Sequence, residues 1–339
     1  MSKFITRRFL WMLVVLFLIS ILTFLLMRSV PGGPFSREKP LPEATIALLN
    51  EMYNLDAPIT EQYFDYVSEI AIPQVTYGKQ KPSKAFDYLV NIPLPQMFGE
   101  EATLRWVNFG PTFKSRSRSV NDIFRDNLPI SFQLGIAALA VAMAIGVPLG
   151  IVSALKRNTI YDYAGMGTAI LGVSVPVIIT APLLQYIFSV ELKLVPVTGW
   201  GGIQNAILPA VALGFVNAAL IARLTRASLL QVLNEDFIRT ARAKGMPERV
   251  VIIVHALKNS LIPVITILGP MFAALITGTF VVETIFGIPG MGRFFVTSIT
   301  GRDYPVIMGT ILLYAFFLSM MNLFVDIAYA WLDPRIRYS

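Results

Sequence analysis

Long apolar runs without charged residues constrain this chain more than any other feature of its sequence. The first run, Phe9–Met27, has 19 residues and no charge. At about 1.5 Å per residue it makes roughly 28 Å of helix, enough to cross the hydrocarbon core of a bilayer. Similar runs follow at Ser131–Leu155, Tyr163–Val190, Ile203–Ala222, Leu261–Val282 and, interrupted only by Asp326, Val306–Trp331. The pattern predicts an all-α integral membrane protein with six transmembrane helices.

The composition excludes several other classes of protein. Hydrophobic residues make up 55% of the chain and charged residues 14%, against about 45–50% and about 25% in soluble domains. Cysteine is absent, which excludes disulfides, thiolate metal sites and a cysteine nucleophile. The single histidine, His255, excludes a multi-histidine metal site, and we expect it to have a structural role.

The basic residues predict the orientation of the helices. With the N-terminus in the cytoplasm, the short cytoplasmic segments hold 14 Lys and Arg residues and the two short outer loops hold three. This asymmetry is the positive-inside pattern. The net charge of +7 therefore reflects membrane topology and predicts no nucleic-acid surface.

The predicted spans divide the chain into four parts. These are the cytoplasmic N-terminus with the first helix, a large external insert between helices 1 and 2, a five-helix core, and a cytoplasmic C-terminal tail, at residues 1–27, 28–130, 131–332 and 333–339. The N-terminal run is longer than the apolar part of a signal peptide and no small-residue cleavage site follows it, so we interpret it as a retained anchor.

The external insert contains two helix-like runs, Glu43–Tyr53 and Thr60–Ile70, which Pro58 separates because the residue before a proline avoids helix. From Ile70 to Pro111 the insert is rich in Pro, Gly and aromatic residues, and we expect it to be irregular. Two interpretations remain open for it: a small cap on the bundle, or a docking surface for an external protein.

The longest cytoplasmic connection, 223–260, predicts a short helix, a glycine stop and a second helix. Asn234 is a good N-cap residue, and Glu235 and Asp236 place negative charge on the first helical turn. Gly245 suits the position that ends a helix, and Pro247 suits the start of the next one. Such a segment either lies on lipid headgroups or inserts into a groove of another protein.

Four motifs carry a resemblance to a known family. Thr240–Gly245 (TARAKG), followed by His255–Asn259 and Ile262-Pro263, resembles the cytoplasmic loop of binding-protein-dependent ABC importer permeases. The chain resembles a B-type permease subunit of the oligopeptide/dipeptide/nickel branch. In the wider family the loop begins Glu-Ala-Ala, where this chain has Arg239-Thr240-Ala241. The other three motifs, which also resemble that branch, are Phe109–Phe124, Glu283–Pro305 and Asp333–Tyr338.

The resemblance implies a transmembrane subunit of an ATP-driven importer in a bacterial or archaeal plasma membrane. It implies a second homologous permease subunit, two ABC ATPase subunits that bind ATP and Mg, and an external substrate-binding protein. Surrounding membrane lipid is a further expected partner. The chain itself would be neither an enzyme nor a cofactor carrier. Peptides are the expected substrate, with nickel chelates and short oligosaccharides as open alternatives.

The resemblance also implies that the short cytoplasmic helix docks in a cleft of an ATPase subunit. Phe237, Ile238 and Ala241 would be buried in that cleft, and Arg239, Arg242 and Lys244 would lie at its rim. The predicted ATPase-coupling residues are Asn234, Glu235, Asp236, Phe237, Ile238, Arg239, Thr240, Ala241, Arg242, Ala243, Lys244 and Gly245. The residues that line the substrate pathway are not predicted.

Two other functions compete with this interpretation. An ion-coupled secondary transporter usually has charged groups at mid-membrane. Here Asp326 is the only ionisable residue well inside a predicted span. It lies five residues from the end of that span, so snorkelling or a cap to a neighbouring helix explains it better than a proton relay. An intramembrane enzyme would need paired acids, a Ser/His pair or metal ligands within the spans. The chain has no phosphate-binding GxxxxGK[ST] motif, and the glycines of Gly287–Gly292 follow no soluble strand.

Overall fold

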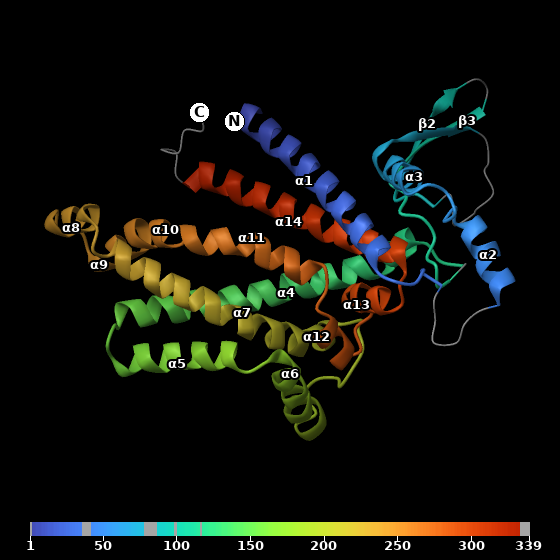
Figure 1. Cartoon of the computed structure of the whole chain (residues 1–339). Coiled ribbons are helices and arrows are strands. Elements are labelled where there is room, and N and C mark those ends of the chain that lie inside the picture. The colour runs from blue at the N-terminus through green and yellow to red at the C-terminus, as the bar shows by residue number, and fades with distance from the viewer. Residues whose placement is uncertain (1, 36–41, 78–86, 98–99, 116, 333–339) are drawn as a thin grey trace. The chain divides into compact units, whose positions relative to one another are not determined.

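The structure is a computed structural model that describes residues 2–35, 42–77, 87–97, 100–115 and 117–332 (Figure 1). It has two compact units. The first comprises residues 1–12, 130–292 and 316–339, and the second comprises residues 13–129 and 293–315. Helices α1 (Ser2–Ser29), α4 (Val120–Leu155) and α14 (Tyr304–Leu332) contribute residues to both units. The predicted tail motif Asp333–Tyr338 lies outside the described residues.

All six predicted apolar runs are largely helical, but the run Tyr163–Val190 is broken at Val175-Pro176 and the run Leu261–Val282 is broken at Thr277–Thr279. Among the described residues, four helices are long and apolar enough to cross a membrane: Phe4–Ser29, Val120–Leu155, Ile203–Val232 and Tyr304–Tyr329. Two bent pairs, Ile160–Ser174 with Val177–Glu191 and Glu248–Ser260 with Ile262–Ile276, also satisfy the length and composition criteria. The first pair bends by 102° at Val175-Pro176, because a residue that precedes proline disfavours helical geometry.

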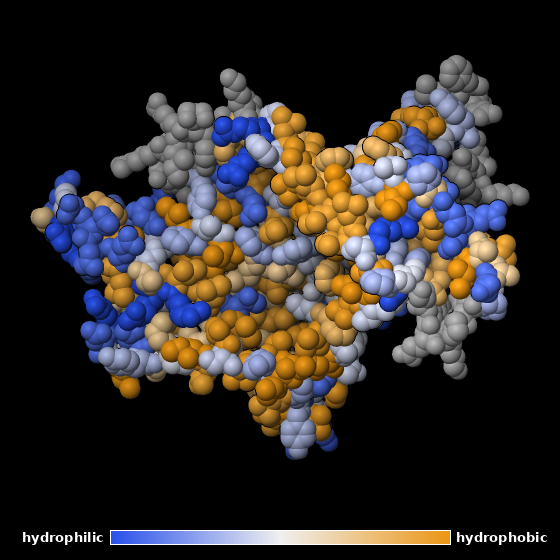
Figure 2. Space-filling view, in the orientation of Figure 1, coloured by the Kyte–Doolittle hydropathy of each residue, from blue (hydrophilic) through white to orange (hydrophobic). Residues whose placement is uncertain are grey.

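The first unit is built on α4, α5 (Ile160–Ser174) and α7 (Ile203–Val232), with α5 and α7 side by side (Figure 1). Helix α6 (Val177–Gln185), the π-helix η2 (Tyr186–Glu191), α11 (Ile262–Ile276) and α12 (Phe280–Ile285) also belong to this unit. The surface over α6 is largely apolar, whereas the surface over α8 (Asp236–Ala243) is hydrophilic (Figure 2). The exposed side chains of α6, such as Ile178 and Leu183, are therefore suited to lipid or to an apolar partner.

Small residues bring the backbones of α4 and α7 into close contact. A Cβ atom on Gly146 would lie 2.6 Å from the carbonyl oxygen of Ala218, and one on Gly150 would lie 2.6 Å from that of Ala222. Glycines four residues apart lie on one face of a helix, and such pairs allow close packing of membrane helices. The pair Gly146 and Gly150 therefore determines how α7 lies on α4.

The second unit corrects one prediction. Helices α2 (Glu43–Met52) and α3 (Ile59–Ala71) confirm the two predicted helical runs, and Pro58 is the N-cap of α3. The stretch from Ile70 to Pro111, however, is not irregular. It contains a three-stranded antiparallel sheet with the strands β1 (Gln74–Tyr77), β2 (Val90–Met97) and β3 (Glu100–Trp106). In the sheet, β3 lies between β1 and β2.

The sheet also explains why the all-α prediction is incomplete. Its apolar residues alternate along each strand, so that Val75, Leu104 and Ile92 are cross-strand neighbours on one face. Two prolines in β2, Pro93 and Pro95, argued against a strand. They are tolerated because β2 is an edge strand. An edge strand forms hydrogen bonds with a neighbour on one side only, so it can accommodate a proline that lacks an N–H donor.

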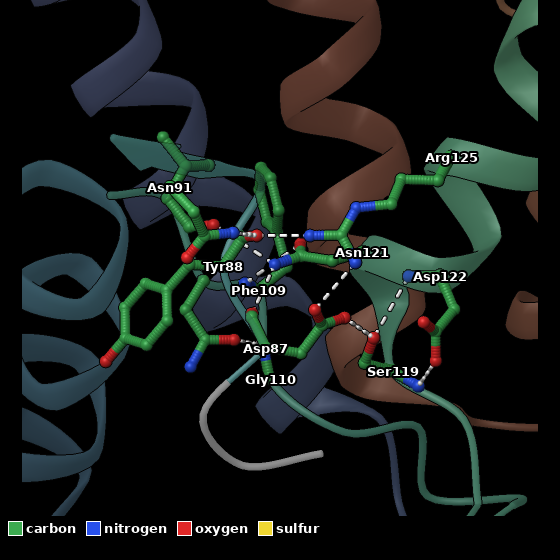
Figure 3. Close-up of polar contacts among 11 residues, drawn as sticks. Asp87, Tyr88, Asn91, Phe109, Gly110, Ser119, Asn121, Asp122 and Arg125 are labelled. Atoms are coloured by element: carbon green, nitrogen blue, oxygen red, sulfur yellow. Dashed lines mark hydrogen bonds and ion pairs between the residues drawn. The ribbon is translucent and has the colours of Figure 1, made fainter. Parts of the chain in front are cut away.

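A polar cluster joins this sheet region to the start of α4 (Figure 3). Ser119 and Asp122 form a reciprocal capping box, with distances of 2.9 and 3.0 Å between backbone nitrogen and side-chain oxygen. The Asn121 amide donates to the carbonyl oxygens of Asp87 and Val107, and Arg125 lies 2.7 Å from the Asp87 carboxylate. The motif Phe109–Phe124 thus has a structural role as the beginning of α4.

We expect Gly150→Val to destabilise the first unit by about 1–3 kcal/mol, because the added side chain collides with the α7 backbone. Thermal denaturation of the purified protein measures the effect. Gly167→Val is the matched control, since a Cβ atom at Gly167 meets nothing within 4 Å. Equal melting temperatures for the two variants would contradict the proposed role of this contact.

Candidate functional site

The predicted cytoplasmic helix is present as α8, which follows α7 after a three-residue turn. Its first residue is Asp236 and its N-cap is Glu235, whose side chain makes no capping hydrogen bond. The prediction that Asn234 is the N-cap is therefore wrong by one residue. The Asn234 amide nitrogen instead donates to the carbonyl oxygen of Leu230 at 2.8 Å, which directs this side chain back toward the last turn of α7.

The end of α8 is as predicted. Gly245 has φ +74°, a left-handed conformation that glycine adopts without steric cost. Its N–H donates to the carbonyl of Arg242 at 2.9 Å, and the N–H of Met246 donates to that of Ala241 at 3.4 Å. These two bonds form a Schellman motif. Pro247 is the N-cap of the next helix, α9 (Glu248–Val250), which continues through η3 (Val251–Ala256) and α10 (Leu257–Ser260).

The two faces of α8 have different environments. Ile238 is 0% exposed and Ala241 is 7% exposed, in an apolar cluster with Leu229, Val251 and Ala256. These two residues are part of the chain's own core, so the prediction that they are buried in a partner's cleft is wrong. Phe237 is 43% exposed.

The remaining predicted coupling residues are exposed. They are Asn234, Glu235, Asp236, Arg239, Thr240, Arg242, Ala243, Lys244 and Gly245. The exposed face of α8 therefore consists of one aromatic side chain surrounded by polar and charged groups.

An ion pair joins α8 to α9 across the Gly245 turn. The Arg242 guanidinium lies 2.6 Å from the Glu248 carboxylate, and this hydrogen-bonded partner raises the pKa of Arg242 above its usual range. Both side chains are about half exposed, so the pair adds little to stability. Its contribution is to orient the turn between the two helices.

A buried ion pair that the sequence analysis missed connects α5 and α7. Asp162 accepts two hydrogen bonds of 2.7 Å from Nε and Nη2 of Arg226, and one of 3.0 Å from the backbone N–H of Asn158. The Asp162 side chain is only 3% exposed. Asp162 lies one residue before the predicted span Tyr163–Val190. An acidic residue so close to an apolar span was the sequence signal that could have indicated a buried ion pair.

A second missed residue, Glu283, explains the glycine-rich segment that follows α12. The Glu283 carboxylate is 1% exposed and accepts hydrogen bonds from the Gly292 N–H at 2.8 Å and the Ser131 hydroxyl at 2.9 Å. The Ser131 oxygen in turn accepts from the Met291 N–H at 2.8 Å. A Cβ atom on Gly290 would lie 2.4 Å from the carboxyl carbon, so glycine is required there.

The two remaining candidates, Asp326 and His255, lie in helices. Asp326 lies 3.1 Å from Arg8 of α1, which confirms that it contacts a neighbouring helix. His255 is in η3, where its carbonyl oxygen accepts a bond from the Asn259 amide. In the described part of the chain, no three His, Asp or Glu side chains are grouped so that they could hold a metal ion.

Comparison with known proteins identifies the family. Residues 146–338 match the family described as binding-protein-dependent transport system inner membrane component, and residues 1–85 match its N-terminal companion family. The chain is 42% identical over 337 residues to the dipeptide transport system permease protein DppB of Bacillus subtilis, covering 99% of this chain and 98% of that protein. It is 40% identical over 340 residues to the oligopeptide transport system permease protein OppB of Escherichia coli K12, covering 100% of both.

A solved structure of the MetNI methionine ABC transporter in an inward-facing conformation shares the fold. The match has a TM-score of 0.53 at 15% identity and covers 62% of this chain and 96% of that chain. Together with the apolar helices, these similarities make the protein an integral membrane component of the cell membrane that works with other ABC subunits. The chain belongs to the family of binding-protein-dependent transport system inner membrane components, as a non-catalytic permease subunit.

Proposed function

We propose that this permease subunit carries dipeptides and oligopeptides. The observation that carries the proposal is the similarity over the full length of the chain to permeases named for dipeptide and oligopeptide transport. Uptake of a radiolabelled dipeptide into proteoliposomes that contain the assembled transporter and its external binding protein tests it. Uptake that requires ATP supports the proposal, and ATP-independent uptake that collapses with the proton gradient contradicts it.

The proposed topology has six spans, each bent pair counting as one. The N- and C-termini and the segment 223–260 lie in the cytoplasm, and the insert 28–130 lies outside, as the distribution of basic residues favours. The chain would form half of the translocation pathway, together with a second homologous permease. Two ABC ATPase subunits would bind ATP and Mg on the cytoplasmic side, and an external binding protein would deliver the peptide.

The proposed coupling element is the exposed face of α8. Phe237 is a large apolar side chain that is exposed and surrounded by charged groups. An exposed aromatic residue among polar groups is typical of an anchor in a protein–protein interface. The opposite face is fixed to the bundle by Ile238 and Ala241. A displacement of the ATPase would therefore move α8 together with α7.

The block formed by α4, α5 and α7 would carry that displacement into the membrane. Gly146 and Gly150 hold α7 against α4, and the Asp162–Arg226 pair holds it against α5. Closely packed helices transmit displacement because interiors of this density have low compressibility. The three helices would then move as one rigid body when the ATPases close.

We expect Phe237→Ala to weaken binding of the ATPase subunits by roughly tenfold or more, since a central aromatic anchor typically contributes at least about 2 kcal/mol to an interface. Titration of the purified ATPase onto the reconstituted permease measures the affinity. The melting temperature should remain that of the wild type, because Phe237 is not in the core.

Ile238→Ala is the contrasting variant on the same helix. It removes a buried side chain and should lower stability by about 2–4 kcal/mol. A Phe237→Ala protein that binds the ATPase as tightly as the wild type would contradict the assignment of the exposed face.

We expect Asp162→Asn to reduce the number of peptides transported per ATP hydrolysed, while hydrolysis itself continues. The substitution leaves Arg226 partly buried without its full counter-charge, which loosens α5 from α7. Simultaneous measurement of uptake and phosphate release gives the ratio.

Exchange of the two residues, Asp162→Arg with Arg226→Asp, should restore part of the coupling. Asp126→Asn is the control, because it breaks the exposed pair with Arg118. An unchanged ratio in Asp162→Asn would exclude a role for the ion pair in transmission.

A further inference from the structure

The second unit contains a cavity of about 290 Å³ at the ends of two spanning helices. Its size is at the lower end of the range for small-molecule sites, about 300–1,000 Å³. The last turns of α1 and the first two turns of α14 supply an apolar floor, which includes Phe24, Met27 and Met308. One face of α3 supplies a polar wall, since Gln62, Asp65, Tyr66 and Glu69 follow helical spacing.

Two residues that line this cavity each have a buried polar atom with no hydrogen-bond partner among the described residues. These atoms are Nε of Arg28 and the hydroxyl of Tyr66. A buried polar group without a partner costs free energy, so each such group calls for an occupant that supplies the bond. The Tyr66 hydroxyl is protonated at neutral pH and so is available as a donor, and burial raises its pKa further.

The Arg28 guanidinium is held in place from three sides. It lies 5.3 Å from the ring centre of Phe24 and 5.5 Å from that of Tyr304, and it donates to the side-chain oxygen of Gln62. The amide nitrogen of Gln62 donates in turn to two backbone carbonyls, of Leu55 and Ala57, which fixes the direction of its oxygen. Arg28 is therefore a preorganised donor for an anionic oxygen.

The charges of the cavity wall indicate what else the ligand carries. Asp65 and Glu69 face the same cavity as Arg28, so the wall holds two carboxylates and one cation. This balance disfavours a ligand whose only charge is negative. It suits a zwitterion with an anionic group beside Arg28 and Tyr66 and an N–H-bearing ammonium group beside the carboxylates.

The position in the chain indicates an amphiphile rather than a free solute. Arg28 is in the last turn of the candidate span Phe4–Ser29, and Tyr304 begins the span Tyr304–Tyr329. Basic and aromatic residues at the ends of spans lie at the level of lipid headgroups. Beside the buried Phe24 and Met27, Leu22, Leu25 and Leu26 are each more than half exposed, which provides an apolar surface for acyl chains.

We propose that this cavity binds the headgroup of a zwitterionic phospholipid that carries a primary ammonium, with its phosphate on Arg28 and Tyr66 and its ammonium on Asp65 and Glu69. Phosphatidylethanolamine has this chemistry. Phosphatidylcholine lacks the N–H donors, and phosphatidylglycerol lacks the ammonium. The bound lipid would join α3 of the insert to the ends of α1 and α14, all within one unit.

Native mass spectrometry of the purified full transporter complex, titrated with each of these three lipids, tests the proposal. We expect phosphatidylethanolamine to be retained most tightly by the wild type. Tyr66→Phe and Arg28→Lys should each lower its affinity by roughly tenfold, because each removes one donor to a charged group. Tyr161→Phe and Arg249→Lys are the matched controls, at exposed positions outside the cavity.

Equal retention of phosphatidylethanolamine by the wild type and both cavity variants would overturn the proposal. Tighter retention of phosphatidylglycerol than of phosphatidylethanolamine would also overturn it. Displacement of the lipid by the dipeptide glycyl-phenylalanine would overturn it as well, because the cavity would then be a site for a solute. Melting temperatures of the complexes show whether a variant has lost its fold. Tyr66→Phe changes one hydroxyl only, and Arg28→Lys retains the charge.

Discussion

The close contact between α4 and α7 is the constraint on which the rest of the first unit depends. Lipid tails solvate an apolar side chain about as well as another helix does, so membrane helices associate through packing rather than through the hydrophobic effect. Gly146 and Gly150 permit that packing by admitting the carbonyl groups of α7 at a distance that no side chain allows. Because α8 follows α7 directly, this contact also determines where the exposed face of α8 lies.

Buried charge reinforces the same arrangement. Asp162 and Glu283 are both carboxylates at the ends of helices, and each has its oxygens satisfied by a guanidinium, a hydroxyl or backbone N–H groups. Such groups are costly to bury alone, so they favour the one arrangement in which their partners are present. The glycine-rich segment Gly287–Gly292 is explained in this way. Two of its glycines, Gly290 and Gly292, make room for the Glu283 carboxylate.

The asymmetry of α8 connects the fold to the function of the family. A helix of eight residues is too short to be stable in isolation. Ile238 and Ala241 attach it to the bundle, and Gly245 and the Arg242–Glu248 pair orient the return of the chain. The side that remains exposed, centred on Phe237, is the part of the segment that a partner subunit meets.

Sequence signals that act between neighbouring residues were sufficient to predict many of the helices of this protein and where they end. The apolar runs determined the spanning helices, Pro58 separated α2 from α3, and Gly245 ended α8. Features that depend on residues far apart in the sequence could not be predicted in this way. The sheet at 74–106 requires β1 to pair with β3 rather than with β2, the strand that follows it in the chain. Arg226, which pairs with Asp162, lies 64 residues away from it, and Ser131, which donates to Glu283, lies 152 residues away. The buried face of α8 depends on α7 and η3. Local steric preferences act within a few residues, whereas pairing and burial exist only once the chain has folded.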